Sequence, residues 1–79
     1  MGQRGLTGEA TKYIAGELRA QKARMGWSLD DIEVRAKVPR STVDRALKGE
    51  GTLAIETLIL LCQGMGLDLV ALVTEAAKR

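Results

Sequence analysis

Residues Gly26–Gly49, GWSLDDIEVRAKVPRSTVDRALKG, contain the strongest structural signals of the chain. Ser28 is a preferred N-cap residue, and Asp31 three positions later makes a variant of the capping box, so a helix begins here and ends near Ala36. Pro39 is well tolerated only at a helix entrance and therefore starts a second helix, which the last glycine of the stretch terminates. The sequence thus predicts two helices of about nine residues each, joined by a turn of roughly three or four.

Three further helices are predicted around this stretch. Apolar residues recur at helical spacing from about residue 7 to 25, and again over about 55–64 and 69–77. Gly64 and Gly66 are expected to break the chain between the last two helices.

The inner faces of these helices define the expected core. Met25 lies on the apolar stripe of the first helix, and Ile55 is placed on the inward face of the fourth. No segment shows the alternation typical of a strand. The sequence therefore predicts an all-α fold of five short helices, in which residues 7–79 form one compact domain and residues 1–6 a flexible N-terminal arm.

Composition excludes several functional classes. The 79 residues include one cysteine and no histidine, which leaves no disulfide, no zinc-ligand set and no histidine-based catalysis. We therefore expect no metal, no cofactor and no enzymatic activity. The longest apolar runs are too short to cross a membrane, and no export signal is recognised, so a cytoplasmic location is expected.

Basic residues are concentrated in two stretches, although the net charge is only +2. Residues 1–27 and residues 37–49 each carry a net charge of +3, whereas residues 28–36 carry −2. This distribution favours a localised face that binds a polyanion. The alternative is an ordinary solvated surface.

Two short helices joined by a tight turn have the geometry of a helix-turn-helix. The segments Gly26–Ser28, Val38–Val43, Leu47–Glu50 and Ile55–Leu58 resemble the lambda-repressor-like helix-turn-helix family (Cro/C1, also called XRE), and the resemblance covers roughly residues 13–73. It implies a compact five-helix DNA-binding domain with the helix-turn-helix at the second and third helices. The partner that the resemblance implies is double-stranded DNA.

Three residues depart from the pattern of the family. Glu33 stands where the family usually has a small residue, and we expect it to swing outward or to pair with Arg35, Lys37 or Arg40. Lys37 stands where the turn usually has glycine, and because a left-handed conformation costs a non-glycine residue about 1 kcal/mol, we expect a reshaped turn. Leu29 replaces a glutamine that many relatives use to contact a phosphate, so this contact is expected to be absent.

The third helix carries the candidate base contacts. An α-helix fits the major groove of B-DNA, and its first two turns reach base edges. A guanidinium can bond both acceptors of guanine, a hydroxyl can donate to a base or a phosphate, and a carboxylate can accept from cytosine. The candidates are Arg40, Ser41, Thr42, Asp44 and Arg45. For Asp44 the alternative is an ion pair with Arg40 or Lys48, four residues away on the same helix.

Basic residues near the motif are the candidate phosphate contacts, which position a protein on DNA without reading its sequence. They are Lys22, Lys37 and Lys48, together with Arg4 if the N-terminal arm enters a groove. The alternative for Arg4 is a plain terminus that contacts nothing.

These features predict a sequence-specific transcriptional regulator: a phage-type or bacterial repressor that binds a pseudo-palindromic operator as a dimer, on the nucleoid of a bacterial cell or phage-infected host. Leu60, Val70 and Ala77 lie outside the core stripes of their helices and form the candidate dimer interface. The alternative is that they merely flank the core of a monomer. One alternative function is the antitoxin of a toxin–antitoxin pair. Another is a protein-interaction module on the same fold, but the arginines of the third helix argue against this module.

Overall fold

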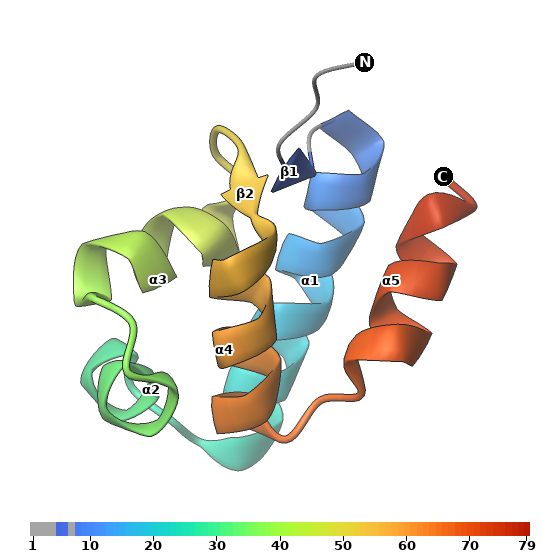
Figure 1. Cartoon of the computed structure of the whole chain (residues 1–79). Coiled ribbons are helices and arrows are strands. Elements are labelled where there is room, and N and C mark those ends of the chain that lie inside the picture. Colours follow the sequence, from blue (N-terminus) through green and yellow to red (C-terminus); the bar gives the residue numbers. More distant parts are fainter. Residues whose placement is uncertain (1–4, 7) are drawn as a thin grey trace.

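The structure is a computed structural model that describes residues 5–6 and 8–79. Its elements, in chain order, are β1 (Gly5–Leu6), α1 (Gly8–Met25), α2 (Leu29–Ala36), α3 (Arg40–Lys48), β2 (Leu53–Ala54), α4 (Ile55–Met65) and α5 (Leu69–Ala77). Figure 1 shows α4 in the middle of the view, with α2 and α3 on one side of it and α5 on the other. The prediction of an all-α domain built from five helices is confirmed.

The two short strands β1 and β2 pair with each other in antiparallel orientation. Gly5 lies opposite Ala54, and Leu6 lies opposite Leu53. The prediction that no segment forms a strand is wrong here, because a strand of two residues is too short to show an alternating pattern. The arm predicted over residues 1–6 therefore includes β1, and residues 1–4 lie outside the described residues.

Side chains from all five helices contribute to the core, and none of its buried side chains is aromatic. The largest fully buried side chains are Ile14, Leu18, Ile32, Val43, Leu58, Leu61 and Met65. Two residues predicted on the inner faces are exposed instead, Met25 at 52% and Ile55 at 46%. Met25 is the last residue of α1 and Ile55 is the first of α4. Each side chain therefore lies beyond the part of its helix that packs on the core.

The predicted capping box starts α2. The Ser28 side chain accepts a hydrogen bond from the Asp31 backbone N–H at 3.0 Å, and the Asp31 carboxylate accepts one from the Ser28 backbone N–H at 2.8 Å. Hydrogen bonding to the Ser28 backbone N–H, and secondarily to the Ser28 side chain, lowers the pKa of the Asp31 carboxyl below its usual 3.8. The ionised form of Asp31 therefore stabilises the start of the helix-turn-helix motif.

Asp31→Asn is expected to produce a stability loss that depends on pH. Because the folded-state pKa of Asp31 is depressed, its stabilisation is complete above about pH 4 and is lost as the pH falls through the folded-state value. Thermal melts at several pH values should show a Tm gap between wild type and variant near neutral pH that closes in acid, below the usual pKa of 3.8. Glu56→Gln is the matched control, because Glu56 lies in the first turn of α4 and makes no hydrogen bond with a described residue. A gap that persists in acid would contradict the role of the ionised carboxylate.

Gly64 lies inside α4, and the prediction that it breaks the chain is wrong. A Cβ built on Gly64 would lie 2.5 Å from Cα of Ala36, so only glycine lets the backbones of α2 and α4 approach this closely. The helix ends instead at Gly66, which has the left-handed φ of 71° typical of a C-cap. Arg35 adds a further link between the two helices: its Nε donates to the Gly64 carbonyl at 2.9 Å, and its guanidinium lies 4.3 Å from the ring centroid of Trp27.

Candidate nucleic-acid interface

The turn between α2 and α3 is held by Lys37 in a left-handed conformation. Its φ and ψ are 60° and 40°, and its backbone N–H donates to the Glu33 carbonyl at 2.8 Å. The expectation of a reshaped turn is wrong: the lysine adopts the conformation that glycine usually supplies, and its αL geometry costs about 1 kcal/mol. Among the described residues, the half-buried Glu33 forms no ion pair with any of the three predicted cations.

The helix α3 is divided into a buried face and an exposed face. Val43, Ala46 and Leu47 pack into the core. Arg40, Ser41, Arg45 and Lys48 are exposed, while Thr42 and Asp44 are half-buried at the borders between the two faces. A side-chain N–H of Arg19 in α1 donates to the Leu47 carbonyl and so ties the last turn of α3 to α1. The candidate base contacts are therefore presented on a helix whose position the core determines.

Two ion pairs restrain charged side chains of α3. Arg40 Nη1 lies 3.0 Å from Asp30 Oδ1 of α2, and Lys48 Nζ lies 3.0 Å from Asp44 Oδ2. The hydrogen bond to Asp44 raises the pKa of Lys48, so its ammonium group stays charged at physiological pH. The pairing of Asp44 with Lys48 is the alternative expected for Asp44 from their spacing of four residues on one helix. Arg45 has no ion pair with a described residue, and its guanidinium is available to a ligand.

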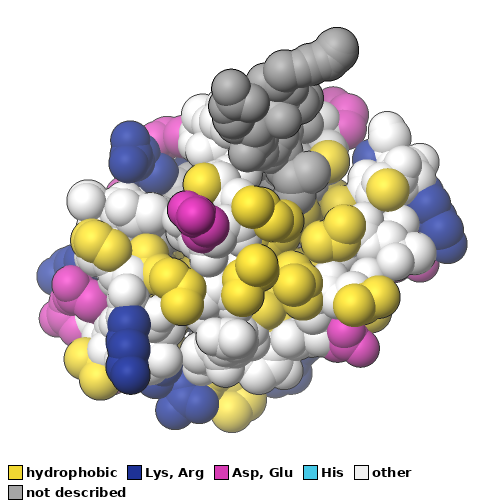
Figure 2. Space-filling model, viewed as in Figure 1, with side chains coloured by type: hydrophobic (Ala, Val, Ile, Leu, Met, Phe, Trp, Pro, Cys, Tyr) yellow, Lys and Arg dark blue, Asp and Glu magenta, His cyan; other side chains and the backbone are white. Residues whose placement is uncertain are grey.

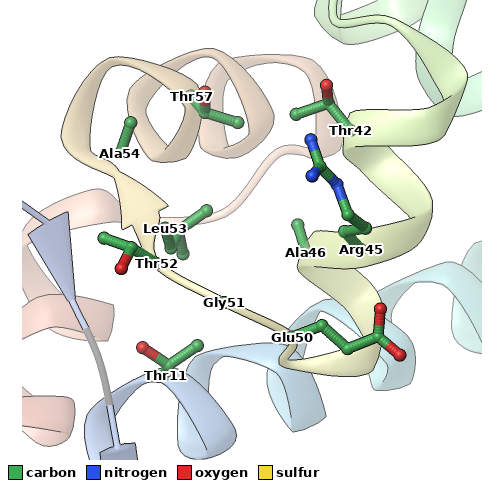
Figure 3. A pocket seen from close by; sticks show the side chains of 10 residues that line it. All are labelled: Thr11, Thr42, Arg45, Ala46, Glu50, Gly51, Thr52, Leu53, Ala54 and Thr57. Carbon is green, nitrogen blue, oxygen red and sulfur yellow. The ribbon is translucent and has the colours of Figure 1, made fainter.

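A surface pocket of about 440 Å³ lies between α3, the start of α4 and α1. Thr42 and Arg45 project into it from α3 and face Thr57 of α4, while Thr52 and Glu50 belong to the loop that closes it (Figure 3). Thr52 and Thr57 were not predicted as contacts from the sequence, because both lie outside the two helices of the motif, although Thr57 falls within the Ile55–Leu58 segment that resembles the family. The pocket groups hydroxyls, one guanidinium and the Glu50 carboxylate beside the first turn of α4, and its hydroxyls and guanidinium can donate to an anionic oxygen.

Two further pockets lie on the opposite flank of α3. Arg40, Ser41, Asp44 and Leu29 line a shallow pocket of about 520 Å³ between α2 and α3. A third pocket of about 350 Å³ continues toward α1, where it is lined by Arg19, Lys22 and Lys48, with Leu29 and Leu47 among its apolar residues. The predicted base contacts thus divide into two groups, with Arg40, Ser41 and Asp44 facing α2, and Thr42 and Arg45 facing the loop before α4.

The other predicted contacts are dispersed around the motif. Lys22 is half-buried beside the third pocket, and Lys37 is exposed at the end of α2. Arg4 lies outside the described residues. The structure therefore brings Lys22 and Lys48 together at one pocket and leaves Lys37 apart from them.

The predicted dimer residues are on the surface. Leu60 in α4 and Val70 in α5 are 39% and 73% exposed, and Ala77 at the end of α5 is exposed as well. Figure 2 shows apolar side chains gathered over α4 and in the space between α4 and α5. The exposed Ile55 adds to the apolar surface of α4.

Among the described residues, no group of three or more histidine, cysteine, aspartate or glutamate side chains is arranged to hold a metal ion. The same part of the chain contains no helix with the length and apolar character needed to span a bilayer. Cys62 is buried, and burial raises the pKa of its thiol, so the thiol stays protonated and poorly reactive near neutral pH.

Comparison with known proteins agrees with this geometry. The model of the helix-turn-helix family matches residues 18–72, and the chain belongs to this family, a class of DNA-binding regulators. The matched segment contains the whole of α2, α3 and α4. The lambda-repressor-like family predicted from the motif residues is confirmed.

Solved structures with similar folds include two regulators. The wild-type restriction-modification controller protein C.Esp1396I aligns with a TM-score of 0.75 at 14% sequence identity, over 90% of this chain and 92% of that chain. The clp gene regulator ClgR from C. glutamicum aligns with a TM-score of 0.72 at 20% identity, over 87% of this chain and 90% of that chain. At these identities the likeness shows a shared fold. No curated protein sequence matches significantly.

Proposed function

We propose that this protein binds double-stranded DNA in a sequence-specific manner and represses transcription, acting in the cytoplasm on the nucleoid. The observation that carries the proposal is the exposed face of α3, where Arg40 and Arg45 stand on opposite flanks with pockets beside them. Two arginines on one helix suit the major groove, because each guanidinium can bond both acceptors of a guanine. The names of the two structural neighbours, a controller protein and a gene regulator, support the same role.

The basic groups around α3 are suited to the two phosphate backbones that border a major groove. Lys22 and Lys48 lie at the pocket toward α1, and on the other flank the hydroxyl residue Thr57 lies at the pocket beside α4, next to the base-reading candidate Arg45. Each phosphate that such groups neutralise releases counterions, which makes affinity depend on salt.

Binding to duplex DNA is expected to weaken steeply with salt, with a slope of about −0.9 in log affinity against log salt for each phosphate contact. Selection from a random duplex library followed by anisotropy titrations at several salt concentrations would measure both the motif and the slope. Lys48→Ala should reduce the slope by about 1 and weaken cognate and random duplexes alike. Recovery of no motif, with no preference for duplex DNA over a neutral competitor, would contradict the proposed function.

We further propose a twofold-symmetric dimer on DNA, joined through Leu60, Val70 and Ala77. One recognition helix reads only about four or five base pairs, and related repressors combine two half-sites spaced by one helical turn. The three side chains are a small apolar surface, so the free dimer should be weak and DNA should supply the remaining free energy.

Val70→Asp is expected to reduce binding to a two-half-site operator far more than binding to a single half-site, because charge on the interface removes cooperativity and leaves α3 unchanged. Val34→Asp is the matched control: Val34 in α2 is 75% exposed, close to the 73% of Val70, and lies outside the proposed interface. It should change binding to both DNAs by the same factor. Equal losses for Val70→Asp on the two DNAs, or a selected motif without symmetry, would count against this dimer.

A further inference from the structure

An ion pair joins the two helices of the helix-turn-helix motif. Asp30 is the second residue of α2 and Arg40 is the first residue of α3, and Arg40 Nη1 donates to Asp30 Oδ1 at 3.0 Å. The two side chains are 69% and 59% exposed. Solvent-exposed ion pairs contribute little to stability. The main effect of this pair is therefore to restrain the orientation of the Arg40 side chain.

Asp30 has no evident role in capping α2. The neighbouring Asp31 already supplies the carboxylate of the capping box. An additional negative charge beside the first turn of α3 opposes the approach of phosphates and therefore lowers the affinity for any duplex. Asp30 in the first turn of α2 also interacts favourably with the helix dipole, but this effect does not require a contact with Arg40. The observed contact with Arg40 is what points to selectivity.

We propose that Asp30 is a positioning residue that determines specificity by orienting Arg40 toward a base edge. The inference rests on the proposed function of α3 in reading DNA. A guanidinium has five N–H donors in a rigid plane, and the bond to Asp30 occupies one side of it and leaves the other donors available. Without Asp30 the long Arg40 side chain is free to pair with the nearest phosphate, a contact that carries no sequence information.

Asp30→Asn distinguishes the positioning role from a simple charge effect. Removing the charge should raise affinity for DNA, whereas removing the restraint on Arg40 should lower the preference for the operator. Loss of a negative charge should raise affinity for random duplex DNA by about twofold to threefold. Loss of the restraint should lower the preference for the selected operator over random DNA by roughly tenfold, with the loss concentrated at the one base position that Arg40 reads. Titrations on the operator and on its single-base variants measure both quantities.

Glu33→Gln is the matched control on the same helix. It removes the same charge from α2, and Glu33 makes no ion pair with a described residue. Affinity for operator and random duplexes should rise together, with the base preference unchanged. Melting temperatures of both variants, measured alongside, show whether the fold is retained.

A double variant tests whether Asp30 acts through Arg40. In the Arg40→Ala background, Asp30→Asn should cause no further loss of base preference. If Arg40→Ala itself leaves the preference unchanged, base reading by Arg40 fails, and the inference fails with it. If Arg40→Ala removes the preference while Asp30→Asn preserves it, the positioning role of Asp30 is overturned and the proposed function stands. A uniform loss of affinity for all duplexes in Asp30→Asn would show a merely structural role and overturn the inference as well.

Discussion

Gly64→Ala is expected to destabilise the protein by about 3 kcal/mol, at the upper end of the usual cost of overpacking. The added Cβ would lie 2.5 Å from Cα and 2.7 Å from the backbone nitrogen of Ala36, so no side-chain rotation can relieve the clash. Because Ala36 is the last residue of α2, the displacement is transmitted to the turn at Lys37 and to α3. Operator affinity should therefore fall together with stability, as measured by chemical denaturation and DNA titration.

Gly16→Ala provides a matched control in the interior of α1. The nearest atom to its new Cβ is the flexible end of Arg19 at 3.7 Å, an ordinary contact. Alanine is favoured over glycine inside a helix, so this substitution should stabilise the protein by about 0.5–1 kcal/mol. Equal effects for the two variants would contradict the close approach of α2 and α4.

Arg45→Ala is expected to cost about 1–3 kcal/mol of binding free energy at the selected operator and to relax the preference at one base position. Arg45 is exposed and makes no ion pair with a described residue, so truncation removes a DNA contact and disrupts no described ion pair in the protein. Arg40→Ala should have an effect of the same kind at a different base. Selections and titrations with each variant would identify the two positions.

Lys48→Ala is the comparison that distinguishes a contact with bases from a contact with the DNA backbone in these selections and titrations. Its loss should weaken operator and random DNA by similar factors, because a phosphate contact does not depend on sequence. If Arg40→Ala and Arg45→Ala both leave the selected motif unchanged, α3 is not the helix that reads the bases.

Local chemistry in the sequence was sufficient to predict the helix-turn-helix. Ser28 and Asp31 satisfy each other's backbone groups within four residues, and Pro39 starts the next helix by its own fixed geometry. The exposed face of α3 followed from helical periodicity around Val43 and Leu47, which are buried as predicted. These features depend on residues that are close together in the chain, so they can be predicted without knowledge of the tertiary structure.

Contacts between segments that are distant in the chain become apparent only in the folded protein. The packing of Gly64 on Ala36 and the position of Thr57 beside Arg45 depend on how α4 crosses the motif. The pairing of β1 with β2 likewise joins residues that are far apart in the chain. Capping and periodicity act over a few residues, so the helices and the exposed residues of α3 can be predicted from the order of amino acids alone. The close approach of backbones and the partners of Arg40 and Arg45 arise from packing, which only the folded chain specifies.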